Sequence, residues 1–199
     1  MTYNSGAVIH IMFLQPDPEK DPWLNRLTAA LGGVIHQCQG FCHVEISVPH
    51  GVDHVSSSIY QGECVSCNKT KTFANPGYIV HSISVTHDEL TKIKKFMGDS
   101  YSNKVKFDSD GMYFALLPFS VSTTPKNKTF CSRYVTEALQ TAGINCVEGI
   151  DASLVSPSKL YKLLTEDNAG RQVMSTVDFK KNKMMSFWAD KTRPSPNLM

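Results

Sequence analysis

Apolar and polar positions follow two different periods along this chain. Residues 7–14 form an almost continuous apolar run, which predicts a buried strand. Residues 41–48 alternate instead, so a second predicted strand has one apolar face and one polar face. The polar face carries His43, Glu45 and Ser47. The ionisable side chains of this strand therefore point away from its apolar side.

A hairpin is predicted where the second strand ends. Residues 49–53 have turn chemistry, and residues 55–61 are rich in β-branched, aromatic and serine side chains, so we expect two antiparallel strands. With the turn centred on Gly51-Val52, Ser58 and Tyr60 would come close to the polar face of the preceding strand.

The first predicted helix covers residues 22–31. Asp21 is a favourable N-cap residue, and Pro22 suits the first helical position because its missing N–H would have no partner there. Leucines then recur at helical spacing until the pair Gly32-Gly33, which we expect to end the helix.

A strand over residues 78–85 leads into the second predicted helix. Thr86 and Glu89 have the spacing of a capping box, in which each residue satisfies a backbone N–H of the other. Helical periodicity continues over residues 87–97, and Gly98 is the expected end.

The second half of the chain predicts one more strand and two helices. Residues 112–119 are nearly continuously apolar and of strand length. Apolar positions then recur at helical spacing from Cys131 until Gly143, and Ser156-Pro157-Ser158 starts a last helix. The mixture predicts an α+β fold, in which an antiparallel sheet carrying His43 packs against the helix that begins at Cys131.

Composition and charge restrict the classes of function. With 199 residues, 41% of them hydrophobic, the chain can bury one sizeable core. We expect one domain over residues 1–166 and a polar, basic tail over residues 167–199. Because the formal net charge is only +2, nucleic acid is not an expected partner. A competing hypothesis, nucleic-acid binding through the tail, predicts steeply salt-dependent binding that is lost when residues 168–199 are deleted.

The chain contains no segment near the roughly 20 apolar residues of a membrane span, and its apolar start lacks the flanks of a signal peptide. We therefore expect a soluble, intracellular protein, and the sequence leaves its oligomeric state open. In a reducing compartment the six cysteines would be free thiols, metal ligands or a nucleophile. They are Cys38, Cys42, Cys64, Cys67, Cys131 and Cys146.

Cys131 is the residue best placed for covalent chemistry. It stands in the first turn of a predicted helix after a polar loop, where unpaired backbone N–H groups and the helix dipole favour the thiolate. The thiolate is the nucleophilic form, and the same N–H groups could donate to an oxyanion. The competing interpretation is a small core residue, since Cys131 shares a helix face with Val135 and Ala138.

A thiol nucleophile requires a base, and the chain has seven histidines. His81 alternates with Ile79 and Ile83, which favours a core histidine. His43 stands near the start of its strand, on the polar face that it shares with Glu45. Either a catalytic base or an ordinary exposed polar face accounts for that position.

Two short motifs resemble the circularly permuted branch of the papain-like cysteine hydrolases and acyltransferases. They are Phe41-Cys42-His43-Val44-Glu45-Ile46 and, far downstream, Phe130-Cys131-Ser132-Arg133-Tyr134-Val135-Thr136-Glu137-Ala138-Leu139. The branch includes NlpC-type peptidases, lecithin retinol acyltransferase-like enzymes and members encoded by large DNA viruses. Its histidine precedes its cysteine, as here, in reverse of the papain order. The resemblance implies that His43 is the base and Cys131 the nucleophile.

The resemblance also implies a third residue that orients the imidazole, usually from the strand paired with the histidine strand. In this chain that segment, residues 55–61, has no Asp, Glu or His at the matching place. Two candidates remain. Glu45 is preferred over Ser58, because a carboxylate also stabilises an imidazolium.

A zinc site is a second hypothesis for the remaining cysteines. Cys64 and Cys67 form a CxxC motif, and Cys38 and Cys42 lie upstream. The upstream pair lacks the usual knuckle spacing, and recruiting His43 as a ligand would remove the base. We therefore expect no metal and no other cofactor.

The sequence thus favours a cysteine hydrolase. His43 would deprotonate Cys131, the thiolate would attack an amide, peptide or (thio)ester carbonyl, and water or another acceptor would resolve the acyl-enzyme. Peptide or amide substrates are preferred, because a lipid enzyme would often carry an apolar anchor. The alternatives are a lipid or thiol acyltransferase of the same fold, and a zinc-binding or catalytically silent interaction module.

Overall fold

The computed structural model describes residues 6–68, 77–115, 125 and 127–166. The tail predicted over residues 167–199, and with it the proposed domain boundary, lies outside the described residues. The elements in chain order are β1 (Ala7–Leu14), α1 (Trp23–His36), β2 (His43–His50), β3 (Asp53–Ser58), β4 (Ser66–Asn68), β5 (Tyr78–Val85), α2 (His87–Ser102), β6 (Lys106–Phe107), α3 (Ser109–Phe114), β7 (Lys128–Thr129), α4 (Cys131–Ala142), the 3₁₀ turns η1 (Asn145–Val147) and η2 (Ala152–Leu154), and α5 (Pro157–Glu166).

The main sheet has five strands in the order β4-β3-β2-β1-β5, and every pairing in it is antiparallel. β1 lies between β2 and β5, so Phe13 is opposite Val44 on one side and Ile79 on the other. β2 and β3 are joined by a tight turn in which His50 pairs with Asp53. The predicted hairpin and the predicted α+β fold class are both confirmed.

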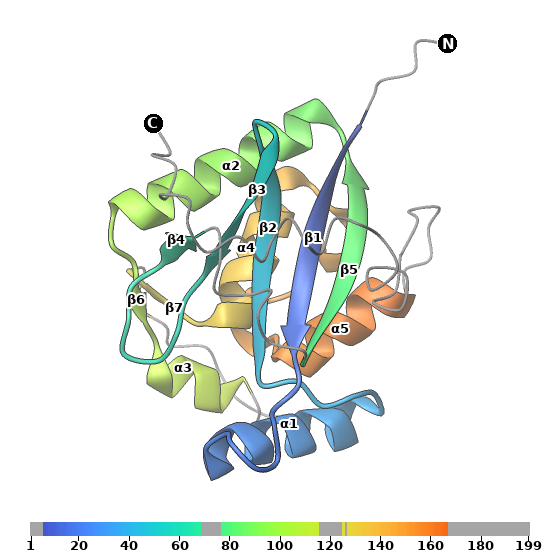
Figure 1. Cartoon of the computed structure of the whole chain (residues 1–199), viewed down its shortest axis with the longest axis vertical. Helices are drawn as coiled ribbons and strands as arrows, with labels where there is room; N and C mark the ends of the chain where they lie inside the picture. The colour runs from blue at the N-terminus through green and yellow to red at the C-terminus, as the bar shows by residue number, and fades with distance from the viewer. Residues whose placement is uncertain (1–5, 69–76, 116–124, 126, 167–199) are drawn as a thin grey trace.

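Helices cover one face of this sheet. In Figure 1, α2, α4 and α5 lie behind the strands, whereas α1 runs across the end of the sheet. α4 packs against both β2 and α2. Fully buried side chains such as Ile11, Ile46, Val135 and Leu139 fill the layer between sheet and helices. This packing brings the start of α4 to the start of β2.

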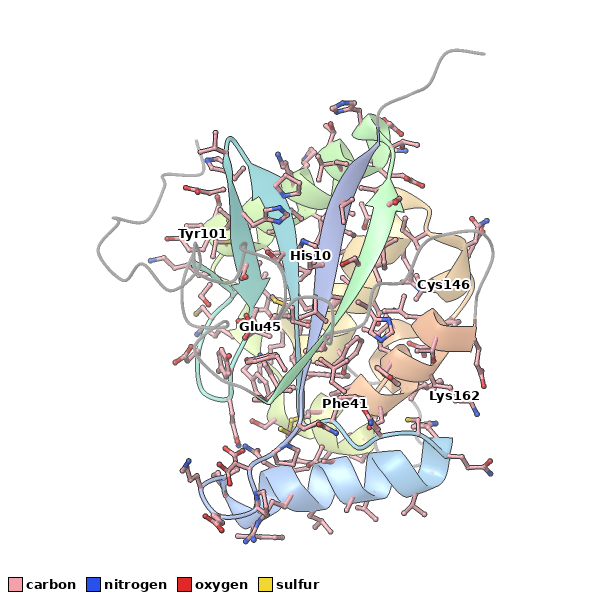
Figure 2. All side chains as sticks on the ribbon, turned by 45° about the vertical axis from the view of Figure 1, so that its right-hand side comes forward. His10, Phe41, Glu45, Tyr101, Cys146 and Lys162 are labelled. Atoms are coloured by element: carbon pink, nitrogen blue, oxygen red, sulfur yellow. The ribbon has the colours of Figure 1, made fainter. Side chains whose placement is uncertain are left out.

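α1 turns its small residues inward. Its buried positions are Thr28, Ala29 and Gly32, and a Cβ atom on Gly32 would lie only 2.7 Å from the Ser158 Oγ of α5. The helix also exposes large apolar side chains: Trp23, Leu27, Leu31, Val34 and Ile35. Figure 2 shows side chains of α1 directed away from the rest of the molecule. No helix within the described ranges is both long and apolar enough to cross a membrane.

The predicted ends of two helices are wrong. α1 starts one residue later than expected, with Pro22 as its N-cap residue and no side-chain cap, and it continues past the glycines to His36. It continues because Gly32 permits close packing against α5. α2 likewise passes Gly98 and ends at Ser102. A single interior glycine costs a helix only about 1 kcal/mol, which packing can offset.

The strand predicted over residues 112–119 is also wrong where it can be judged. Residues 112–114 belong to α3, and residues 116–119 lie outside the described part of the chain. The Asp108 side chain caps this short helix by accepting a hydrogen bond from the Gly111 N–H at 3.1 Å. An apolar run alone does not reveal such a cap.

Candidate active site

Cys131 is the first residue of α4, and only 3% of it is exposed. Phe130 is the extended N-cap residue and supplies no side-chain cap, so the first-turn N–H groups remain available to another acceptor. The backbone N–H groups of Ser132 and of Val44 in β2 both act to lower the pKa of Cys131. Backbone groups from two different elements therefore favour the thiolate.

His43 provides the positive charge beside this sulfur. Burial by itself raises the pKa of Cys131, but the charge of His43, its hydrogen bond and the two backbone donors outweigh burial and lower the pKa. Burial by itself lowers the pKa of His43, but the Cys131 thiolate and the Glu45 carboxylate raise it to about 9. Both directions favour a thiolate–imidazolium pair.

Glu45 contacts the same imidazole from within β2. Its Oε1 lies 3.4 Å from His43 Nε2, and Glu45 is 2% exposed. The contact follows from strand geometry, because residues two apart share one face. Glu45, the candidate preferred from the sequence, therefore lies beside the imidazole of His43.

Two tyrosines hold the Glu45 carboxylate. Tyr60 and Tyr78 donate hydrogen bonds to its Oε1 at 2.6 and 2.8 Å. The Tyr60 ring also stacks on His43, with ring centroids 4.2 Å apart. Burial and then the charge of Glu45 raise the pKa of both phenols, so both remain protonated donors. Figure 2 shows Glu45 toward the end of the sheet nearer α1.

Sequence reasoning anticipated Tyr60 near His43 but missed Tyr78. Tyr78 begins β5, which β1 separates from β2, so no local pattern links it to Glu45. Ser58, the other candidate for orienting the imidazole, is buried in β3. Among the described residues, no hydrogen bond joins its side chain to His43.

A narrow cavity borders the proposed nucleophile. Its volume is about 10 Å³, close to the minimum that one water molecule needs. It is lined by Thr28, Cys42, Met112, Ala115, Phe130, Cys131, Ser132, Ser156 and Pro157. Residues of α1, α3, α4 and α5 therefore meet around this cavity beside the sulfur.

The four cysteines of the zinc hypothesis do not converge. The Cys38 sulfur lies 3.4 Å from a backbone carbonyl of α5, Cys42 borders the cavity, and Cys67 contacts a serine of β3. Within the described ranges, no group of three or more His, Cys, Asp or Glu side chains is arranged to hold a metal ion. The observed positions therefore give the zinc hypothesis no support.

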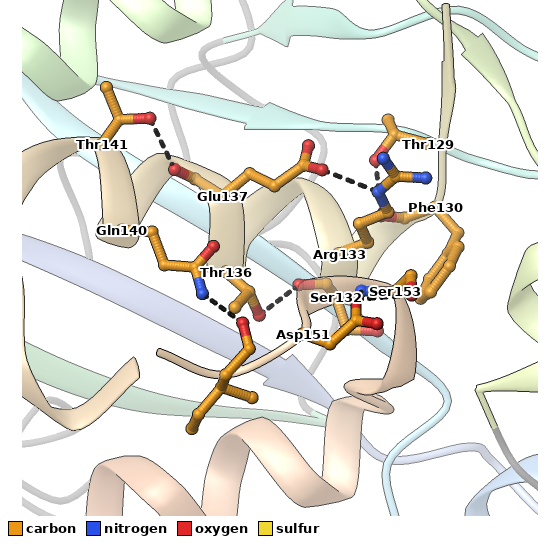
Figure 3. A network of polar contacts seen from close by, with 11 residues as sticks. Thr129, Phe130, Ser132, Arg133, Thr136, Glu137, Gln140, Thr141, Asp151 and Ser153 are labelled. Carbon is orange, nitrogen blue, oxygen red and sulfur yellow. Dashed lines mark hydrogen bonds and ion pairs between the residues drawn. The ribbon is translucent and has the colours of Figure 1, made fainter. Parts of the chain in front are cut away.

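A polar network fixes α4 behind Cys131 (Figure 3). Arg133 Nε lies 2.7 Å from Glu137 Oε1 along the helix. Gln140 Nε2 donates to two carbonyls of the following segment, at 2.9 and 2.6 Å. These bonds hold the C-terminal end of α4 against the turns that follow it.

The structure therefore gathers a thiol at a helix start, a buried imidazole and a buried carboxylate in one place. A scan of the chain against protein-family models found no match, and a search of curated proteins found none either. The function is therefore inferred from the geometry of the site and from the sequence motifs.

Proposed function

We propose that this chain is a cysteine hydrolase of the circularly permuted papain-like type. Cys131 is the nucleophile, His43 is the general base and acid, and Glu45 orients His43. The observation that carries the proposal is the buried pair of Cys131 and His43, whose neighbours reverse the effect of burial on both pKa values. The motifs around His43 and Cys131 support the same family.

The first half-reaction forms an acyl-enzyme. The thiolate attacks the carbonyl carbon, and the electron pair of the C=O bond moves to oxygen, where the Cys131 N–H at the start of α4 donates to it. The His43 imidazolium gives its proton to the leaving nitrogen as the carbon–nitrogen bond breaks.

The second half-reaction releases the acid. Neutral His43 takes a proton from water, the hydroxide attacks the thioester, and the thiolate leaves, which restores the starting ion pair. Glu45 stabilises the imidazolium and fixes the ring through Nε2 in both halves.

Peptide or amide bonds are the proposed substrates. A lipid or thiol acyltransferase would form the same acyl-enzyme and pass it to an acceptor other than water, so it remains the alternative. A catalytically silent interaction module makes a different prediction, because its Cys131 would be no more reactive than the other cysteines.

Thiol labelling across pH tests the proposal. The full-length reduced protein is treated with limiting iodoacetamide, and the labelled sites are located by mass spectrometry. We expect Cys131 to label ahead of Cys64 and Cys146 near neutral pH. His43→Ala should slow the Cys131 reaction and move it to higher pH, because the main cause of its lowered pKa is lost. Equal labelling of the three cysteines, or no response to His43→Ala, would overturn the proposal.

A further inference from the structure

Cys42 lies beside the proposed nucleophile. It immediately precedes His43 and is half-buried. Its backbone N–H donates to the carbonyl of Leu14 at 3.0 Å, and its sulfur lies 3.6 Å from the same oxygen. These contacts anchor it between the end of β1 and the start of β2. Of the described cysteines, only Cys42 and Cys131 line the narrow cavity.

The two sulfur atoms are close enough to interact electrostatically. Burial, and then the negative charge on Cys131, raise the pKa of the Cys42 thiol to about 12. The shared cavity supports the same closeness, because Cys42 and Cys131 both line it. Cys42 is thus a thiol on the same narrow cavity as the proposed nucleophile.

The remaining cysteines have other surroundings. They are Cys38, Cys64, Cys67 and Cys146. Cys38 contacts the backbone of α5, and Cys67 contacts a serine of β3. The backbone of Cys64 pairs with that of Lys106 in β6 through an isolated β-bridge. Figure 2 shows Cys146 well apart from Glu45. The neighbouring thiol that the fold offers to Cys131 is therefore Cys42.

We propose that Cys42 is a resolving thiol, which converts peroxide-oxidised Cys131 into a reversible Cys42–Cys131 disulfide. The inference rests on the proposed function, because it needs the nucleophilic thiolate of Cys131. It adds regulation to that site, since the disulfide blocks the nucleophile and a reductant restores it.

The oxidant is hydrogen peroxide, and the steps balance. The Cys131 thiolate attacks one peroxide oxygen, the O–O bond breaks, and the sulfur becomes a sulfenic acid while hydroxide leaves. The Cys42 sulfur then attacks the oxidised sulfur, the S–S bond forms, and the S–O bond breaks with loss of water. Two thiols and one peroxide give one disulfide and two waters.

Formation of the sulfenic acid itself prepares Cys42 for the second step. The sulfenic acid is neutral, so the thiolate charge that helps to raise the pKa of Cys42 disappears. The resolving step therefore becomes easier only after Cys131 has been oxidised.

Peptide mapping tests the inference without any substrate. The full-length reduced protein is treated with equimolar hydrogen peroxide, quenched with an alkylating agent and digested without reduction. We expect a peptide pair linked through Cys42 and Cys131, two hydrogens lighter than the two thiol peptides together. Dithiothreitol should separate the pair and restore labelling of Cys131.

Cys42→Ser and the matched control Cys146→Ser sharpen the test. In Cys42→Ser, Cys131 should proceed to sulfinic acid, which dithiothreitol does not reverse. Cys146→Ser should still form the linked pair. Oxidation of wild-type Cys131 to sulfinic acid without a link, or a link to another cysteine, would overturn the resolving role and leave the hydrolase proposal standing. A Cys131 that resists peroxide but still labels first with iodoacetamide would overturn the resolving role alone, and one that resists both reagents would overturn both proposals.

Discussion

At the scale of single residues, the site has to keep three charges in an interior where burial opposes each of them. An isolated buried carboxylate is costly, so Glu45 requires donors. Tyr60 and Tyr78 supply two hydrogen bonds to Oε1, and His43 supplies a positive charge beside the same oxygen. Changing Glu45 or Cys131 should therefore change the titration of His43, because both raise its pKa.

Glu45→Gln should lower the pH at which His43 loses its proton. The amide keeps the shape of the side chain and can still accept from the tyrosines, but it removes one of the causes that raise the pKa of His43 to about 9. We expect the imidazole NMR titration of His43 to move down by about one pH unit, a tenfold change in proton affinity. Glu148→Gln, at an exposed position, is the control and should leave the His43 titration unchanged.

Cys131→Ala should shift the titration of His43 to lower pH. A pKa raised to about 9 means that the wild-type ring stays protonated through pH 8 and loses its proton near pH 9. The alanine removes the largest cause of the increase, while burial still acts to lower the pKa. Imidazole NMR resonances measure the change, with Cys146→Ala as the matched control. Loss of the wild-type proton near pH 6.5, or an unchanged titration in Cys131→Ala, would contradict the ion pair.

At the scale of helices and strands, sequence reasoning succeeded where the deciding contacts are local. The capping box of Thr86 and Glu89 is formed as predicted, with reciprocal hydrogen bonds of 3.2 and 2.7 Å. α4 ends at Ala142, and its C-cap residue Gly143 adopts the left-handed conformation that glycine favours. The end of α1 could not be predicted in this way, because it depends on packing between Gly32 and a serine far along the chain.

Gly32→Ala and Gly98→Ala should have opposite effects on stability. The new Cβ atom at position 32 would meet Ser158 Oγ at 2.7 Å, and that oxygen already accepts a hydrogen bond from the Phe41 N–H at 3.1 Å. Ser158 cannot move freely, so we expect a loss of about 1–3 kcal/mol in the free energy of unfolding. Position 98 has open space, and alanine there should add roughly 0.5–1 kcal/mol. Urea unfolding followed by circular dichroism measures both, and equal effects would contradict the packing described for α1.

At the scale of the whole molecule, the order of the strands in the sheet brings together residues that lie far apart in the sequence. β1, the first strand, inserts between β2 and β5, and this insertion brings Tyr78 to the carboxylate of Glu45 across an intervening strand. His43 and Cys131 could be singled out from the sequence because each occupies a recognisable local position, a strand start and a helix start. Tyr78 could not, because its role depends on a sheet order that no local pattern contains.

Reactivity of Cys131 should therefore disappear together with the fold. The groups that lower its pKa come from β2 and α4, which only tertiary packing joins. We expect the preference for Cys131 over Cys64 at neutral pH to be lost in urea at the same midpoint as the circular dichroism signal, after which all six thiols should label alike. Pulse labelling across a urea series measures the preference, and Cys131→Ala accounts for the background from the other thiols. If the preference for Cys131 survives unfolding, its reactivity comes from the local sequence. If the preference is lost well before unfolding, β2 and the start of α4 separate while the rest of the fold persists.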